Sequence, residues 1–162
     1  MADLSATTLV ETRPRGKKSF IIADGVTVYA NMLAGLEAGY LNHWADAANE
    51  VDVFVGIVVG GEDRADDGVL TGETSDSKPP EARVDTTGAT LRGLTVGGTP
   101  TQAKVGDLVY CGTSNPSDIT LDSSGRTSAI GWMSRYTSAT DQEVELFTPA
   151  EFLAYQQESP GS

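Results

Sequence analysis

"VDVFVGIVVGG" (residues 51–61) has the pattern of a β-strand that is buried on both faces. β-Branched residues dominate the run, Gly56 lies inside it, and Gly60 and Gly61 close it. A short continuous apolar run bounded by turn residues is typical of such a strand. A glycine in the interior indicates a point where another backbone comes close. We therefore expect this stretch to form the centre of a β-sheet.

The segments on either side extend this β pattern. "SFIIADGVTVYANMLAGLEAGYL" (19–41) has a turn signal at Asp24 and Gly25, and alternating valines follow it, which predicts a hairpin. Residues 62–90 are polar and rich in turn residues, which predicts a long surface loop with one edge strand at most. With 18 glycines and short apolar runs throughout, the class is all-β, a single small β-barrel or tulip-like domain over residues 19–147.

The second half resembles the first in outline. Val109 and Tyr110 correspond to Val28 and Tyr29, and Ile130-Gly131-Trp132 (130–132) corresponds to Val55-Gly56-Ile57 (55–57). A duplicated β unit or two sides of one barrel would give this pattern, and so would chance recurrence of short strands.

The two ends of the chain differ from this β pattern. Residues 1–18 have few residues that could form a core, and Pro14 and Gly16 interrupt regular structure, so we expect an extended N-terminal arm. For residues 148–162 we expect a short helix followed by a tail. Thr148 precedes Pro149 and Glu151 in the order of a capping box, which predicts a helix over 149–158.

The overall charge limits the partners that the protein can have. The formal net charge is -12, and four cations cluster in "TRPRGKKSF" (12–20), so setting these four aside leaves -16 for the rest. Such an acidic surface would repel nucleic acid. No apolar run reaches the length that spans a bilayer and the start lacks the order of a secretory signal, so we expect a soluble protein made in the cytoplasm, with no membrane contact. Cys111 is the single cysteine, and its apolar neighbours predict a buried thiol.

Candidate catalytic and binding groups are few. Glu62, Asp63, Asp66 and Asp67 cluster, but they lack the alternation of a calcium loop and are expected to face water. His43 is the single histidine, and a general base needs an orienting partner that the sequence does not show. We expect no enzyme activity, no metal site and no cofactor.

Aromatic side chains suggest one other kind of site. Exposed rings can stack on sugars, and the candidates are Trp44, Trp132, Tyr29 and Tyr136. Trp132 lies in an apolar strand and is expected in the core, which leaves Trp44 as the more exposed tryptophan.

Four stretches together resemble the capsid decoration or cement proteins of tailed phages, small head proteins of which one group was long described only as a domain of unknown function. They are "ADGVTVYANMLAGLEAGYL" (23–41), "VFVGIVVGG" (53–61), "KVGDLVYCGTSNPSDI" (104–119) and "SAIGWMSRYTSATDQEVEL" (128–146). That family is similar in its Val-Tyr strand, its G-x-L-V-x-L-x-x-G-Y step and its apolar-Gly-apolar strand. This chain has Asn31 and Ala34 where the family pattern often has Gly and Val.

The resemblance implies a structural protein of the virion rather than an enzyme. Trimers would bind the major capsid protein on the outer capsid surface and stabilise the mature shell, with many weak contacts adding up through multivalency. The arm would add as a strand to a sheet edge of the shell. Its contact residues would be Leu9, Val10, Arg13, Arg15, Lys17 and Lys18, although these cations could equally be ordinary solvent-facing charges.

Three alternatives remain open at this point. Phe152 and Tyr155 share a helix face that would pack on the barrel or on a neighbouring subunit. A carbohydrate-binding β-module on a virion or secreted protein would use Trp44 and nearby tyrosines. A small β-barrel hydrolase would use the acidic loop at residues 62–67, which would require a cleft and a carboxyl group of raised pKa.

Overall fold

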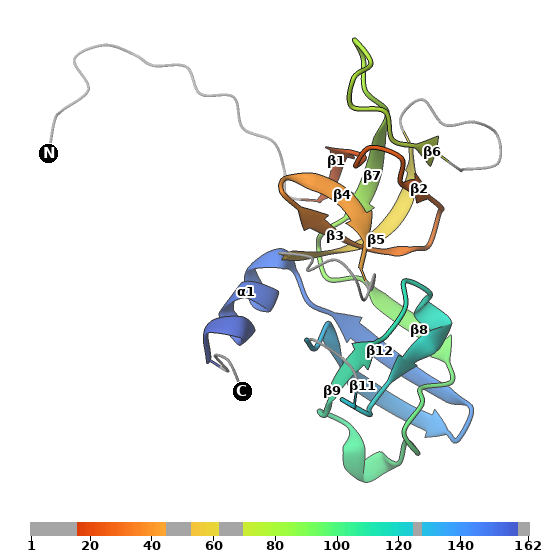
Figure 1. Cartoon of the computed structure of the whole chain (residues 1–162). Coiled ribbons are helices and arrows are strands. Elements are labelled where there is room, and N and C mark those ends of the chain that lie inside the picture. The colour runs from red at the N-terminus through yellow and green to blue at the C-terminus, as the bar shows by residue number, and fades with distance from the viewer. Residues whose placement is uncertain (1–15, 45–52, 62–69, 125–127, 159–162) are drawn as a thin grey trace, which may run out of the picture.

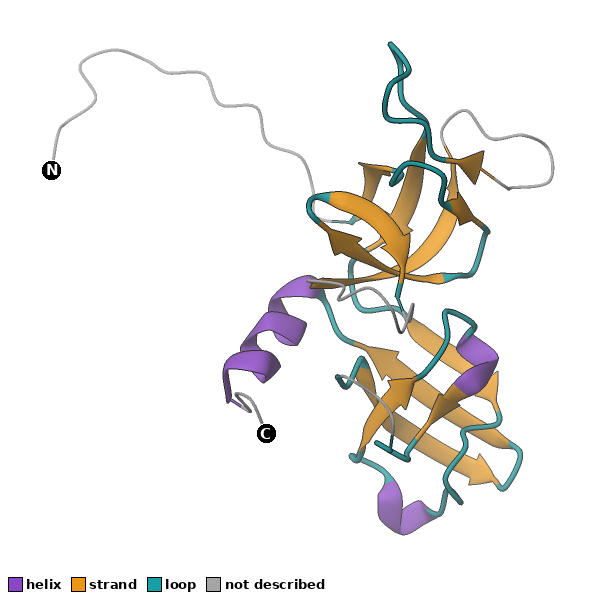
Figure 2. Ribbon diagram, in the orientation of Figure 1, coloured by secondary structure: helices purple, strands orange, loops and turns teal. Residues whose placement is uncertain are grey.

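The computed structural model describes residues 16–44, 53–61, 70–124 and 128–158. Strands make up 49% of these residues, with one α-helix near the end, so the all-β class with a short C-terminal helix is confirmed (Figure 2). The strands of the first half are β1 (Lys17–Ile21), β2 (Thr27–Val28), β3 (Leu33–Glu37), β4 (Tyr40–His43), β5 (Val53–Gly61), β6 (Leu70–Thr71) and β7 (Glu81–Asp85). The remaining elements are β8 (Thr90–Leu94), η1 (Gln102–Lys104), β9 (Leu108–Cys111), η2 (Pro116–Asp118), β10 (Ile119–Thr120), β11 (Gly131–Ser138), β12 (Asp141–Leu146) and α1 (Pro149–Glu158).

Within the described part of the chain, the strands form two five-stranded antiparallel sheets. Their orders are β1-β7-β5-β3-β4 and β10-β9-β11-β12-β8, and β2 pairs with β6 in a separate ribbon. Each sheet curls: a bridge joins Ile22 to Leu41 across the first, and a bridge joins Gly97 to Thr120 across the second. The two curled sheets lie end to end, and α1 lies beside their junction (Figure 1).

The central strand β5 is buried on both faces. Val55 and Val58 belong to the apolar cluster of the first sheet itself, whereas Phe54 and Ile57 belong to a larger apolar cluster shared with the second sheet and α1. Gly56 lies between these residues in the strand and has a φ of 134°. A Cβ atom on it would lie 2.1 Å from the carbonyl oxygen of Asp85. The close backbone approach predicted for Gly56 is therefore confirmed, and this position excludes any side chain.

The hairpin predicted for the first sheet was wrong. Asp24 and Gly25 do not close a hairpin, because β1 pairs with β7 and β2 pairs with β6. The hairpin is instead β3–β4, connected by two residues with positive φ, Ala38 and Gly39.

Residues 62–90 are also more ordered than expected, over the part of this range that the structure describes. The segment contains β7, which lies between β1 and β5 and buries Ala82 and Val84 completely. It is therefore an internal strand, and within the described part of this range residues 72–80 project as a loop between β6 and β7 (Figure 1).

The two correspondences expected between the halves of the chain differ in outcome. Val28 lies in the small β2–β6 ribbon, whereas Val109 lies in a strand of the second five-stranded sheet. Gly56 and Gly131 each lie in the central strand of a five-stranded sheet, and a Cβ on either would meet a backbone carbonyl at 2.1 or 2.3 Å.

Candidate interaction surface

The first sheet begins within the basic segment, so the structure describes only the later part of that segment. Leu9, Val10, Arg13 and Arg15 lie outside the described residues. Lys17 and Lys18, which the sequence assigned to the arm, form the beginning of β1 and pair with Asp85 and Val84. Both lysines are exposed. The ordered sheet thus begins two residues earlier than expected, because β7 provides a partner for these residues.

The two lysines point to opposite faces of the sheet, because side chains alternate along a strand. Lys17 is opposite Asp85, whose pKa is lowered mainly by the hydroxyl of Thr87. Partial burial of Asp85 opposes this shift, and the backbone N–H of Thr87 and the charge of Lys17 add to it. The carboxylate accepts from the Thr87 hydroxyl at 2.5 Å and from its backbone nitrogen at 3.0 Å.

Lys18 lines a groove at the point where the described chain begins, which we call the β1 groove. Its volume is 620 Å³, and it is lined by Gly16, Lys18, Phe20, Leu36, Val53, Val55, Thr86, Thr87, Thr148, Pro149 and Ala150. The apolar side chains come from β1, β3, β5 and the start of α1, and the three threonines supply hydroxyl groups. Lys18 is the one charged residue among the described residues that line it. This combination suits an extended peptide segment with apolar side chains.

Phe152 packs inside its own chain rather than on a neighbouring subunit. It is 3% exposed, and its ring lies 5.5 Å from Trp44 and 6.3 Å from Phe54. Of the two alternatives for this residue, packing on the β domain is therefore correct. The helix prediction is also confirmed, since α1 spans Pro149–Glu158 and Thr148 and Glu151 form both bonds of the capping box, at 3.0 and 3.1 Å.

Tyr155 lies beside the second sheet. Its ring is 5.9 Å from that of Phe147, and its hydroxyl bonds with that of Tyr110. Burial raises the pKa of Tyr110, and Tyr155 adds to this rise through its charge and the hydrogen bond. Both predicted helix residues therefore have partners within the chain.

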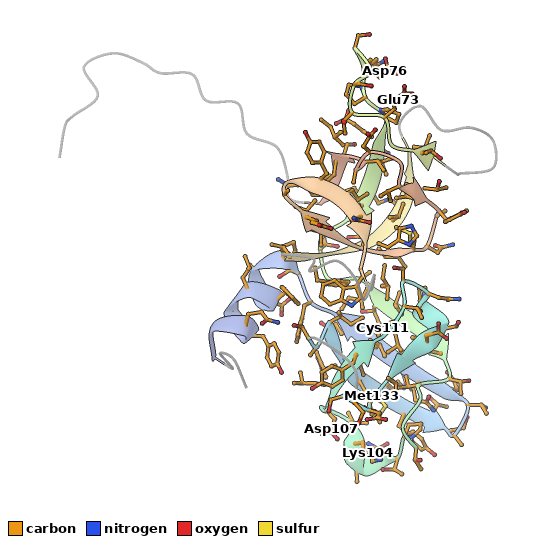
Figure 3. The ribbon with its side chains drawn as sticks, viewed as in Figure 1. Glu73, Asp76, Lys104, Asp107, Cys111 and Met133 are labelled. Carbon is orange, nitrogen blue, oxygen red and sulfur yellow. The ribbon has the colours of Figure 1, made fainter. Side chains whose placement is uncertain are left out.

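The groups considered for catalysis are not gathered into a site among the described residues. The acidic cluster Glu62, Asp63, Asp66 and Asp67 lies outside those residues. Within the described part, no group of three His, Cys, Asp or Glu side chains could hold a metal ion. Glu73 and Asp76 lie at one end of the molecule, and Lys104 and Asp107 lie at the other (Figure 3).

Cys111 and His43 have structural partners. Cys111 is buried at 4% exposure, as expected, and its thiol donates to the carbonyl of Asn115 at 3.4 Å. The Nε2 atom of His43 lies 2.7 Å from the carbonyl oxygen of Thr27, which ties β4 to β2. In the described part of the chain, no helix is long and apolar enough to cross a membrane.

Trp44 is not available as a sugar-binding platform. It is 5% exposed, and it makes an edge contact with Phe54 at 5.2 Å, so the expectation that it would be the more exposed tryptophan was wrong. Trp132 is partly exposed. Of the four candidate rings, Tyr29 is the most exposed, at 50%, and it lines a hollow together with residues 114–116. The sequence named Tyr29 but contained no signal that paired it with a loop more than eighty residues away.

Comparisons with known proteins give little beyond the fold. No protein-family model matches the sequence, and a search of curated proteins finds no match. Among solved structures, a chain from "The capsid of Myoviridae Phage XM1" is similar, with 19% sequence identity and a TM-score of 0.48. The alignment covers 92% of this chain and 93% of that chain. A likeness of this degree does not by itself indicate what the present chain does.

Proposed function

We propose that this protein is a non-enzymatic structural component of a tailed-phage head. It binds the major capsid protein on the outer surface of the capsid as trimers and stabilises the mature shell. The proposal rests on the sequence motifs shared with decoration proteins. The structural observation that supports it is the continuation of the basic N-terminal segment into an edge strand beside an apolar groove.

The shared motifs have clear structural tasks in this chain. Asn31 stands where the family pattern often has Gly, and its φ is 68°. This left-handed conformation favours glycine, and asparagine is among the residues that tolerate it best. The step that ends at Tyr40 forms the β3–β4 hairpin, and the apolar-Gly-apolar run forms the central strand β5. The motifs therefore preserve turns and close backbone contacts.

Strand β1 supports the role of the arm. It is at the edge of the first sheet, and residues 1–15 precede it directly, with Arg13 and Arg15 near the junction. A part of the chain that continues from an edge strand is well placed to pair with a strand of another protein. The β1 groove beside it offers an apolar surface to a segment of the shell protein.

The charge distribution supports an outer location. The whole chain has a net charge of -12, and setting aside the four cations of the basic segment leaves -16 for the body, which would be repelled by packed DNA and would keep particles apart in solution. Arg13, Arg15 and Lys18, which lines the β1 groove, are then the cations that face the shell, where they would increase the rate of association with an acidic surface.

Deletion of residues 2–15 tests the role of the arm. This variant keeps Gly16, whose carbonyl accepts from the hydroxyl of Thr86 at 2.6 Å, and keeps all of β1. We expect an unchanged circular dichroism spectrum and the loss of co-sedimentation with purified capsid shells. A truncated protein that sediments with shells as well as the full chain would contradict the role of the arm.

A charge reversal tests whether association with shells depends on the charges of the arm or on those of the rest of the surface. Arg13→Glu with Arg15→Glu should slow association with shells and change its dependence on salt, because both charges would face the shell. The control is Lys78→Glu in the loop between β6 and β7, a single reversal that should leave association unchanged. If Lys78→Glu slowed association about half as much as the double reversal, in proportion to its smaller change in charge, the effect would be a non-specific influence of net charge.

A further inference from the structure

The hollow beside Tyr29 continues into a second hollow, and together they form what we call the inter-sheet groove. The first has a volume of 370 Å³ and is lined by Tyr29, Ala30, Asn31, Met32, His43, Ser114, Asn115 and Pro116. The second has a volume of 480 Å³ and shares His43 and Ser114 with the first. Its other lining residues are Gly25, Val26, Thr27, Asn42 and Thr113. The groove is thus a continuous surface between the first sheet and the loop after β9.

Both walls of this groove are fixed by backbone hydrogen bonds. The N–H of Leu33 donates to the carbonyl of Ser114 at 2.8 Å, which joins the two walls. The N–H of Asn31 donates to the carbonyl of Val58 at 2.7 Å, and this holds the loop that carries Tyr29. On the opposite wall, the side chain of Asn115 accepts from the N–H of Ser117 at 3.0 Å. A groove with fixed walls loses little conformational entropy when a ligand binds.

The lining chemistry favours a neutral ligand that has hydroxyl groups and one apolar face. Among the described residues that line the two hollows, none is Asp, Glu, Lys or Arg. Asn31 and Asn115 have carboxamide groups, which both donate and accept hydrogen bonds. His43 holds the carbonyl of Thr27 through Nε2, so Nδ1 of the neutral ring is an acceptor. Tyr29 adds an aromatic ring that is 50% exposed.

We propose that the inter-sheet groove binds a neutral sugar, with one ring face on Tyr29 and hydroxyl groups on the carboxamides of Asn31 and Asn115. A sugar ring has an apolar face for stacking and hydroxyl groups that match amide groups, so both features of the groove are used. A phosphorylated or carboxylated ligand is disfavoured, because the groove has no cation and the chain has a net charge of -12. This site is independent of the proposed contact between the arm and the shell.

The test uses methyl glycosides of glucose, galactose, mannose and N-acetylglucosamine, with the methyl glycoside of glucuronic acid as the charged counterpart of glucose. Binding to the full chain is followed by titration in protein NMR spectra. We expect at least one neutral glycoside to bind saturably, and the glucuronide to bind more weakly than the glucoside. If none of the neutral glycosides binds, or if the glucuronide binds best, the proposal is wrong.

Variants then locate the site. Tyr29→Ala should weaken binding about tenfold, the effect of losing roughly one aromatic contact, and Tyr29→Phe should keep the affinity because it keeps the ring. Asn31→Gly should also weaken binding while it keeps the turn, since glycine adopts a φ of 68° without strain. The matched control is Tyr40→Ala, a tyrosine that is 40% exposed at the other end of the β3–β4 hairpin. A Tyr40→Ala variant that loses as much affinity as Tyr29→Ala would place binding elsewhere and overturn the assignment.

Discussion

Ala38 occupies a backbone position that suits other residues better. It is the first of two turn residues between β3 and β4, and its φ is 50°, while Gly39 has a φ of 87°. A two-residue turn with both φ values positive favours Asn-Gly. Ala38→Asn should therefore raise the free energy of unfolding by about 0.5–1 kcal/mol, by relieving a left-handed alanine. Urea denaturation at neutral pH measures this.

Ala103→Asn is the matched control for this substitution. Ala103 is an exposed residue of η1 and does not have a positive φ. The same change there should leave the free energy of unfolding within about 0.5 kcal/mol of the wild type. A stabilisation of equal size at both positions would show that the turn conformation is not its cause.

Asp85 makes stability depend on pH at the acidic end of the range. Its pKa is lowered from the ordinary value of 3.8, chiefly by the Thr87 hydroxyl. Because the folded pKa is the lower one, the stabilisation is present above the unfolded pKa and is lost as pH falls through the folded pKa. Thr87→Val should therefore be less stable than the wild type at neutral pH, and the difference should shrink below about pH 4. Urea midpoints at several pH values measure it.

The neighbouring Thr86→Val serves as the control for the pH effect. Its hydroxyl donates to the backbone carbonyl of Gly16, which does not titrate. Its cost in stability should be the same at pH 7 and at low pH. If the costs of both substitutions vary with pH in parallel, the link to the Asp85 carboxylate is wrong.

At the scale of elements, α1 depends on its first turn. Thr148 and Glu151 exchange two hydrogen bonds, so Thr148→Ala leaves an N-terminal N–H of the helix without its partner. We expect a loss of about 1 kcal/mol in the free energy of unfolding, and Thr148→Ser should retain most of it because serine keeps the hydroxyl. Chemical denaturation distinguishes the three proteins. If serine and alanine destabilise equally, the capping bond contributes nothing.

Helix α1 and strand β7 show what the sequence could and could not predict. Helix α1 was predictable with its bounds, because its start signal lies within four consecutive residues, 148–151. Strand β7 was missed, because a short strand with two apolar residues has a weak pattern of its own. Its burial comes from β1 and β5, which are distant in the sequence. Burial of Trp44 was missed for a similar reason, since Phe152 covers it from the far end of the chain.

For the whole molecule, the cluster around Phe152 predicts that the two sheets unfold together. Phe152 packs with Trp44 and with Phe54 of β5, in a cluster that continues into the second sheet. Phe152→Ala should lower the free energy of unfolding by about 3–5 kcal/mol. The neighbouring Leu153→Ala should cost much less, because Leu153 is 46% exposed.

Two probes measure this cooperativity. Tryptophan fluorescence reports on the buried Trp44 and on Trp132 in β11, and far-ultraviolet circular dichroism reports on all the strands. If the two sheets form a single cooperative unit, the two signals change at the same denaturant concentration as each other within each protein, that is, in the wild type and in each variant. Two separate transitions would indicate that the sheets are independent folding units.

The central claim is that this protein decorates a phage capsid. The most direct measurement is its copy number relative to the major capsid protein in purified particles from its source, by quantitative mass spectrometry. Trimers that occupy the whole shell predict a ratio near one copy of this chain for each major capsid subunit. A handful of copies in each particle, or none, would contradict the proposal.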